Sequence, residues 1–123
     1  MVIPRIALDE VILEGVEATV LNAAPGHMPG TPLPGVTGNS VISAHRDRHF
    51  HRLGELALGD TVQTVTRQGR RSWRITERRI VGAGRPALYD TPTATLTLTT
   101  CWPIRYIGPA PDRLLLVAEP VGD

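Results

Sequence analysis

The sequence predicts a small all-β domain, a barrel or sandwich built from roughly seven or eight short strands. Its 123 residues include 12 glycines and 11 prolines, which mark many turns and argue against a helical bundle. Aromatic residues make up only 4% of the chain, so the core must be built from Val, Leu, Ile and Ala. Hydrophobic residues at 41% and charged residues at 20% are typical of a globular protein, and the length predicts one domain.

The first third of the chain predicts two short strands, a short helix and a loop. Apolar runs favour a strand at residues 3–8 and a shorter second strand or turn at residues 11–13. Residues 17–24 favour a short helix. Residues 25–38 contain four prolines and four glycines, a composition that excludes a regular element and predicts a loop.

The rest of the chain predicts mainly strands. Residues 39–45 are typical of a buried strand, and the apolar spacing over residues 46–58 fits one or two helical turns interrupted by Gly54. The remaining strands are predicted at four runs, of which the first two form a hairpin: residues 61–67, 71–81, 95–101 and 113–119.

The second strand of that hairpin is rich in arginine. Side chains alternate between the two faces of a strand. We therefore expect Arg74, Thr76 and Arg78 on one face and the following set on the other: Arg71, Trp73, Ile75, Glu77 and Arg79. The chain has no lysine, few aromatics and a net charge of +1, so we interpret the arginines as mostly a solvated face and expect no nucleic-acid partner.

Composition excludes several classes of chemistry. The single cysteine, Cys101, excludes a disulfide within the chain and a four-cysteine metal site. The absence of lysine excludes a Schiff base formed through a side chain. No run of 18 apolar residues predicts a transmembrane helix, and the first residues lack the pattern of a signal peptide.

Three residues at the ends of predicted strands are candidates for catalysis. Cys101 ends the strand 95–101, where a rigid element can hold a reactive group at a loop; the alternative is a small buried core residue. His45 ends the strand 39–45 and could act as acid or base toward that thiol. Arg113 opens the last strand and could bond a carbonyl oxygen or a developing oxyanion, unless it is simply an exposed strand end.

A metal site is a second interpretation of the histidine segment. His45, Asp47, His49 and His51 lie close together, but the interleaved arginines would repel a divalent cation and no known ligand spacing fits. We therefore expect no metal and no cofactor, with His49 and His51 on a solvated surface.

The order histidine, cysteine, arginine, each at a strand end or start, resembles the sortases, cysteine transpeptidases of bacterial cell surfaces. Residues 97–101 resemble the family's Thr-Leu-x-Thr-Cys signature, residues 39–45 its histidine strand, and Arg113 opens the strand that carries its arginine. Residues 26–31 resemble the loop before the histidine strand. The similarity covers nearly the whole chain, and it is greatest to the class D and Gram-negative types.

This resemblance implies a closed eight-stranded β-barrel with one or two short helices, formed by residues 1–123 as a single catalytic domain. It implies cleavage of a C-terminal Leu-Pro-x-Thr-Gly or Leu-Pro-x-Thr-Ala sorting signal and transfer of the surface protein to an amine acceptor of the cell envelope. The protein would act at the outer face of the cytoplasmic membrane or in the periplasm. We expect membrane attachment only through an N-terminal anchor that this chain does not carry.

The resemblance also implies roles for the site residues. Cys101 would form a thioester with the signal, His45 would transfer protons, and Arg113 would stabilise the oxyanion. We also expect Thr99, Thr100 and Trp102 to bind substrate, with the Thr100 hydroxyl or nearby backbone amides completing the oxyanion site.

Three alternatives stay open. L,D-transpeptidases are also rich in strands, but their signature has Ser-x-Gly before the cysteine, where this chain has Thr99-Thr100. Papain-like cysteine hydrolases have the cysteine before the histidine, the reverse of the order here. The third alternative is a β-barrel binding module in which Cys101 is inert.

Overall fold

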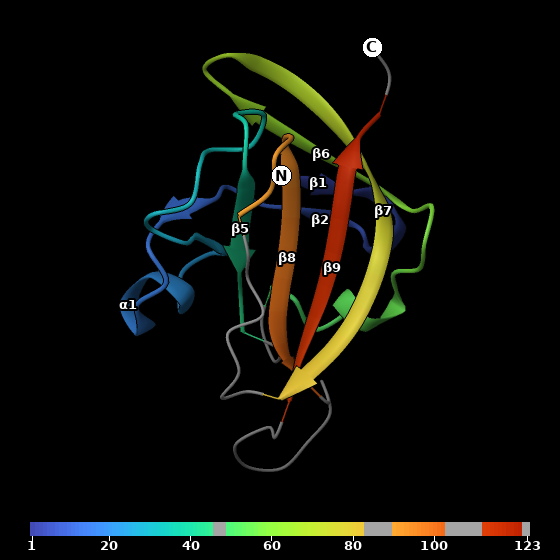
Figure 1. The fold of residues 1–123 in the computed structure, drawn as a ribbon. Helices are drawn as coiled ribbons and strands as arrows, with labels where there is room; N and C mark the ends of the chain where they lie inside the picture. Colours follow the sequence, from blue (N-terminus) through green and yellow to red (C-terminus); the bar gives the residue numbers. More distant parts are fainter. Residues whose placement is uncertain (46–48, 83–89, 103–111, 122–123) are drawn as a thin grey trace.

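The computed structural model describes residues 1–45, 49–82, 90–102 and 112–121; at positions 101 and 102 it describes the backbone. About half of these residues lie in one strongly curved sheet (Figure 1). The strands are β1 (Val2–Ile3), β2 (Leu8–Asp9), β3 (Leu13–Glu14), β4 (Gly26–His27), β5 (Asn39–Ser43), β6 (Thr61–Thr66), β7 (Gly69–Gly82), β8 (Thr95–Trp102) and β9 (Asp112–Pro120).

Short helices interrupt the strands. They are α1 (Ala18–Leu21) and two 3₁₀ turns, η1 (Pro4–Ile6) and η2 (Leu53–Glu55). The helix predicted over residues 17–24 is thus confirmed but shorter, and the predicted helical turns within 46–58 reduce, among the described residues, to η2. None of the described helices has the length and apolar character needed to cross a membrane.

The described part of the chain forms nine strands in the order β2-β1-β6-β7-β9-β8-β5-β4-β3, so the prediction of a closed eight-stranded barrel is wrong in strand number and in closure. The sheet is an open half-barrel whose two edges are β2 and β3. Each edge strand has only two residues, which is too few for β2 and β3 to pair with each other and close the sheet into a barrel. The prediction of a mainly β fold with few helices is confirmed.

Two predicted elements differ from the structure near the N-terminus. Residues 3–8 form a tight antiparallel turn instead of one strand, because Pro4 starts η1 and Ala7 adopts a left-handed conformation at its end. β1 and β2 then pair with each other on either side of this turn. The predicted loop 25–38 contains β4, which joins β3 in parallel and β5 in antiparallel orientation.

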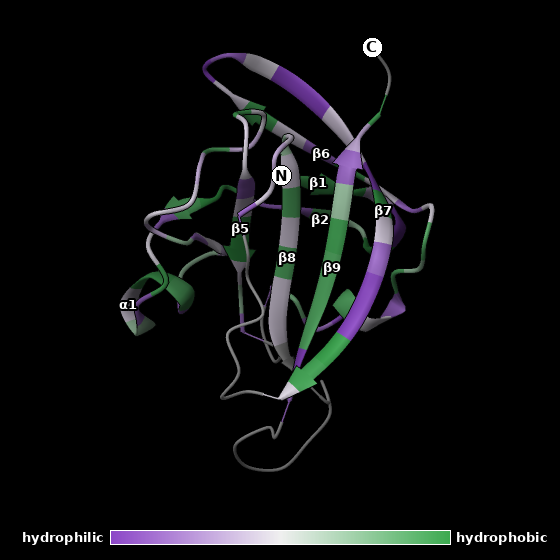
Figure 2. Ribbon diagram, in the orientation of Figure 1, coloured by the Kyte–Doolittle hydropathy of each residue, from purple (hydrophilic) through white to green (hydrophobic). Residues whose placement is uncertain are grey.

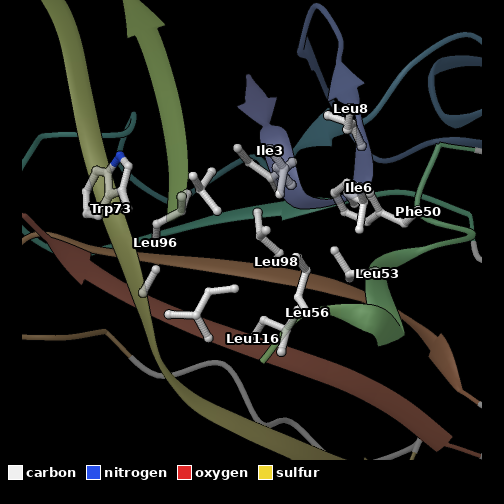
Figure 3. Close-up of a cluster of buried hydrophobic side chains, with 14 of the residues drawn as sticks. Ile3, Ile6, Leu8, Phe50, Leu53, Leu56, Trp73, Leu96, Leu98 and Leu116 are labelled. Carbon is white, nitrogen blue, oxygen red and sulfur yellow. The ribbon is translucent and has the colours of Figure 1, made fainter. Parts of the chain in front are cut away.

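One face of the sheet carries the hydrophobic core (Figure 3). Leu96 and Leu98 of β8 lie opposite Ala118 and Leu116 of β9, and all four are fully buried. The two 3₁₀ turns cover this face with apolar side chains, and Trp73 closes one end by donating its indole N–H to Thr64 Oγ1 at 2.9 Å. The alternating sequence of β8 therefore places Leu96 and Leu98 in the core.

Gly26 controls how closely β3 and β4 approach. A Cβ atom at this position would lie 1.9 Å from the Gly15 carbonyl oxygen, so no other residue fits without separating the strands. We predict that Gly26→Ala lowers the free energy of unfolding by about 3 kcal/mol through overpacking. Urea unfolding measures this change.

The matched control is Gly59→Ala. A Cβ there meets nothing within 4 Å, but the backbone φ is +94°, so we expect only about 1 kcal/mol of strain. Equal losses for the two variants would show that the close approach of β3 and β4 is not what requires glycine at position 26.

Candidate functional site

The strand register brings the three predicted catalytic positions to one end of three adjacent strands. β5 and β8 run parallel, with Ser43 opposite Thr99, and the Ala44 N–H donates to the Thr99 carbonyl oxygen at 3.3 Å. His45 and Cys101 each lie two residues further on. β9 runs antiparallel to β8 with Arg113 opposite Cys101. Since neighbouring strands are about 5 Å apart, the backbones of Cys101 and Arg113 lie side by side, and the neighbouring strand β5 ends two residues before His45.

His45 is held by contacts on both sides. The Phe50 N–H donates to the His45 carbonyl oxygen at 3.3 Å, and the Phe50 side chain is fully buried in the core. Arg52 then bonds the Glu55 carboxylate through Nε and Nη2 and the Ile6 carbonyl oxygen through Nη1. The side-chain hydrogen bonds raise the pKa of Arg52 and lower the pKa of Glu55. Phe50 and Arg52, which follow His45 in the chain, are thus held by the core and by η1, and His45 itself is half-buried.

Thr100 has a different partner from the predicted one. Its side chain is buried, and its hydroxyl donates to the Ala44 carbonyl oxygen at 2.8 Å. That proton is committed within the protein, so the expected role of the hydroxyl in completing the oxyanion site is not supported. The bond instead ties β8, one residue before Cys101, to the residue that precedes His45.

For the peptide cleavage that the sequence resemblance implies, we predict that Thr100→Val reduces kcat by about tenfold, with little change in KM, because the Ala44 carbonyl loses its partner and His45 loses its alignment. Thr100→Ser keeps the hydroxyl and should restore most of the rate. Steady-state kinetics of the two variants test the prediction, and an unchanged kcat for Thr100→Val would contradict it.

Thr99 offers an unused hydroxyl beside the site. It lies in the row between Ser43 and Leu115, is fully buried, and among the described residues its Oγ1 has no hydrogen-bond partner. Buried hydroxyls without partners are rare in proteins and often mark functional positions. The predicted contact of Thr99 with substrate stays a prediction. The same is true of Trp102, which lies at the end of β8 opposite Asp112.

A groove runs along the face of the sheet opposite the core. A cavity of about 140 Å³ is lined by Thr95 and Thr97 of β8, by Leu115 and Val117 of β9, and by residues of β7. A larger cavity of about 650 Å³ lies next to it, and the two share Asn39. The odd-numbered residues of β8 line this face, and Cys101 continues their register beyond Thr99. Along β8, the stretch from Thr95 to Cys101 spans about 20 Å at about 3.3 Å per residue, and the cavity itself covers the part that includes Thr95 and Thr97.

Polar groups line the end of the groove away from Cys101. Asn39 Oδ1 accepts a hydrogen bond from Thr97 Oγ1 at 2.7 Å, and both residues are buried. Asp90 accepts from the backbone N–H groups of Asn39 and Thr91. These bonds join β5, β8 and the segment that precedes β8 into one wall.

A β-bulge corrects the predicted faces of β7. The register with β9 shifts between Ile75 and Glu77, so Trp73 and Ile75 face the core while Glu77 and Arg79 line the groove. Arg79 Nε lies 3.1 Å from Glu77 Oε2 in an ion pair. Figure 2 shows the hydrophilic character of the β6–β7 hairpin and of the middle of β7, in contrast with hydrophobic β9. Strict alternation along a strand has no signal for a bulge, so the sequence did not indicate this pair.

The predicted solvated histidines lie in the turn after residues 46–48. His51 is exposed, His49 is half-buried, and Asp47 lies outside the described residues. Within the described ranges, no group of three or more His, Cys, Asp or Glu side chains is arranged to hold a metal ion. The candidate catalytic groups are therefore the Cys101 thiol, the His45 imidazole and the Arg113 guanidinium. They follow or end the strands whose other residues line the groove.

Comparison with known proteins gives a consistent result. Residues 1–121 match the sortase domain family. The chain is 34% identical to Sortase D of Bacillus subtilis over 126 residues, which covers 97% of this chain and 61% of that protein. A Sortase D5 transpeptidase of Clostridium perfringens superposes with a TM-score of 0.87 at 27% identity, covering 98% of this chain and 76% of that one. Sortase C1 of Streptococcus agalactiae has a TM-score of 0.90 at 26% identity, covering 99% and 66%.

Proposed function

Because the chain belongs to the sortase family, whose members are cysteine transpeptidases that anchor proteins to the cell wall, we propose that it cleaves a C-terminal sorting signal and transfers the protein to an amine. The observation that carries this proposal is the register that pairs Cys101 with Arg113 and ends β5 beside them, two residues before His45. Convergence of a nucleophile, an acid/base and an oxyanion donor is what acyl transfer requires.

In the first half-reaction the Cys101 thiolate attacks the carbonyl carbon of the signal's threonine. Only the thiolate is nucleophilic, and a free cysteine with a pKa of about 8.5 is a few per cent ionised at neutral pH. A protonated His45 favours the thiolate and then gives its proton to the leaving amine as the carbon–nitrogen bond breaks. The product is a thioester on Cys101 and a released C-terminal fragment.

In the second half-reaction an acceptor amine attacks the thioester. His45 takes the proton of the attacking nitrogen, the new amide bond forms, and the Cys101 thiolate leaves. The Arg113 guanidinium stabilises the oxyanion in both tetrahedral intermediates through its planar pair of N–H donors. A thioester suits this sequence because it is reactive toward amines.

The groove fits the expected substrate. A signal of the form Leu-Pro-x-Thr-Gly or Leu-Pro-x-Thr-Ala has five residues and is about 17 Å long in extended conformation. This is close to the span of β8 from Thr95 to Cys101. The apolar Leu115 and Val117 suit the leucine and proline of such a signal. Thr99 lies two residues before Cys101 in β8, and its unused hydroxyl would donate to a backbone carbonyl of the signal.

The partners follow from this reaction. The substrate is a surface protein with the signal near its C-terminus, and the acceptor is an amine of the cell envelope. The chain spans about 61% of the length of the Bacillus Sortase D, so the activity of the complete protein at the envelope is part of the proposal.

The test is transpeptidation of a peptide that contains the signal, with a small primary amine as acceptor. We expect mass spectrometry to detect the peptide cleaved after threonine and joined to the amine, and, without added amine, an adduct on the single cysteine. Peptides with Leu-Pro-x-Thr-Gly and Leu-Pro-x-Thr-Ala are compared with a scrambled control. Transfer from none of the signal peptides, with no adduct on Cys101, would refute the proposed function.

A further inference from the structure

His27 is a buried histidine away from the catalytic row, which consists of His45, Cys101 and Arg113. It ends β4, opposite Glu14 of β3, and only 6% of its surface is exposed. Its Nδ1 lies 2.6 Å from Glu14 Oε1. Its Nε2 lies 2.9 Å from the Pro32 carbonyl oxygen and 3.0 Å from Thr31 Oγ1. The proposed reaction uses none of these groups.

The hydrogen-bond partners define what the ring does. The Pro32 carbonyl can only accept, and Thr31 Oγ1 gives its own proton to the Met28 carbonyl oxygen at 2.7 Å. The His27 Nε2 must therefore carry a proton and donate it. On the other side of the ring, the Glu14 carboxylate lies against Nδ1 and orients the ring toward Thr31 and Pro32.

These contacts connect β3 to the wall of the large cavity. Thr31 Oγ1 also accepts from the Val41 N–H at 3.3 Å, in the strand that leads to His45. Thr31 and Pro32 line the 650 Å³ cavity together with Asn39 and Val41, and that cavity meets the groove at Asn39. Gly38, whose φ is +115°, ends the segment of residues 28–38 where it packs tightly. A Cβ at this position would lie 2.9 Å from Pro32 and 2.8 Å from Asp90.

From this geometry we infer that Glu14 and His27 are positioning residues that hold residues 28–38 in place as one wall of the substrate groove. The inference rests on the proposed function for the groove's occupant. Neither residue lines the groove cavities, so they act through Thr31 and Pro32. Residues 28–38 carry no charged side chain, and the His27 ring contacts this segment through the Pro32 carbonyl oxygen and Thr31 Oγ1.

The first arm of the test measures the wall itself, without any substrate. In Glu14→Ala the ring loses its orienting carboxylate, and we expect the Val41 amide to exchange with solvent about tenfold faster than in the wild type. Glu14 makes no contact with Val41 except through His27 and Thr31 among the bonds described above. Glu14→Gln keeps an acceptor oxygen for Nδ1 and should restore slow exchange.

The matched control is Glu17→Ala. It removes the same charge from an exposed residue that makes no capping hydrogen bond at the start of α1. We expect its Val41 exchange rate to equal that of the wild type. Equal rates in Glu14→Ala and Glu17→Ala would overturn the inference.

The second arm uses the transpeptidation assay. We expect Glu14→Ala and Thr31→Val to raise KM for the signal peptide by about 3–10-fold with kcat changed less than about twofold, because the groove wall is displaced while the catalytic row is not. Thr31→Ser should restore KM. Alkylation of Cys101 by iodoacetamide should stay at the wild-type rate.

The outcomes separate the inference from the function on which it rests. Faster exchange of the Val41 amide in Glu14→Ala with an unchanged KM would overturn the role of the wall in binding. A parallel fall of kcat and of the Cys101 alkylation rate would show a general structural defect instead. A wild-type chain that transfers no peptide would refute the proposed function, and the positioning of the wall by Glu14 would then be decided by the exchange rate of Val41 alone.

Discussion

Replacement of Cys101 by alanine is expected to abolish transpeptidation, with a loss of about 10⁴-fold or more in kcat, because the thioester cannot form without the sulfur. Cleavage of the signal peptide and the mass of the protein after incubation measure the effect. Cys101 is the single cysteine of the chain, so any covalent adduct on sulfur reports on this residue alone.

The control for Cys101→Ala is stability. The variant should unfold at the same urea concentration as the wild type, since one small side chain at the end of β8 is replaced by another. Cys101→Ser, which retains a hydroxyl nucleophile, is also expected to be nearly inactive. Full cleavage by the alanine variant would refute the thioester mechanism. A wild-type thiol that resists iodoacetamide over the whole range from pH 6 to pH 9 would favour the inert binding module.

Replacement of Arg113 by alanine is expected to reduce kcat by about 10²–10³-fold with a smaller effect on KM, since the guanidinium donates mainly to the oxyanion of the transition state. Arg113 lies directly opposite Cys101 in the β8–β9 ladder, which places the two backbones about 5 Å apart. Arg113→Lys should recover only part of the rate, because an ammonium lacks the planar pair of donors.

Arg70→Ala is the matched control for Arg113→Ala. It removes an exposed arginine next to the turn of the β6–β7 hairpin, away from the catalytic row, and should leave kcat unchanged. If Arg113→Ala turned over the peptide at the wild-type rate, the oxyanion role would pass to backbone N–H groups or to the Thr99 hydroxyl, and the roles of Cys101 and His45 would be unaffected.

The candidate site was largely predictable because its signals are local. Alternation in residues 95–101 predicted β8, and the predicted strands 39–45 and 113–119 correspond to β5 and β9 with one or two residues of difference at their ends. Cys101 and Arg113 lie one residue from a strand end and His45 lies two residues beyond β5, where a change from alternation to loop residues is visible in sequence. The convergence of the three strand ends, in contrast, depends on β5 pairing with β8, which are separated by more than fifty residues.

Features that depend on pairing were predicted wrongly or missed. The bulge at Thr76 reverses the faces of β7 after Ile75, and so moves Glu77 and Arg79 to the groove. The partner of the Thr100 hydroxyl, Ala44 O, belongs to another strand. The same is true of the His27–Glu14 pair, whose two members lie thirteen residues apart and meet through the parallel pairing of β3 with β4.

The sequence by itself determined that the chain is mainly β, which residues alternate along β8, and which thiol, imidazole and guanidinium end or begin their strands. These properties follow from side-chain periodicity and turn composition, which act over a few residues. The tertiary structure alone decided that the sheet stays open with nine strands among the described residues, that Thr100 aligns the residue before His45, and that His27 supports the groove wall. These arise from strand register, because pairing between distant segments sets which side chains share a row and a face.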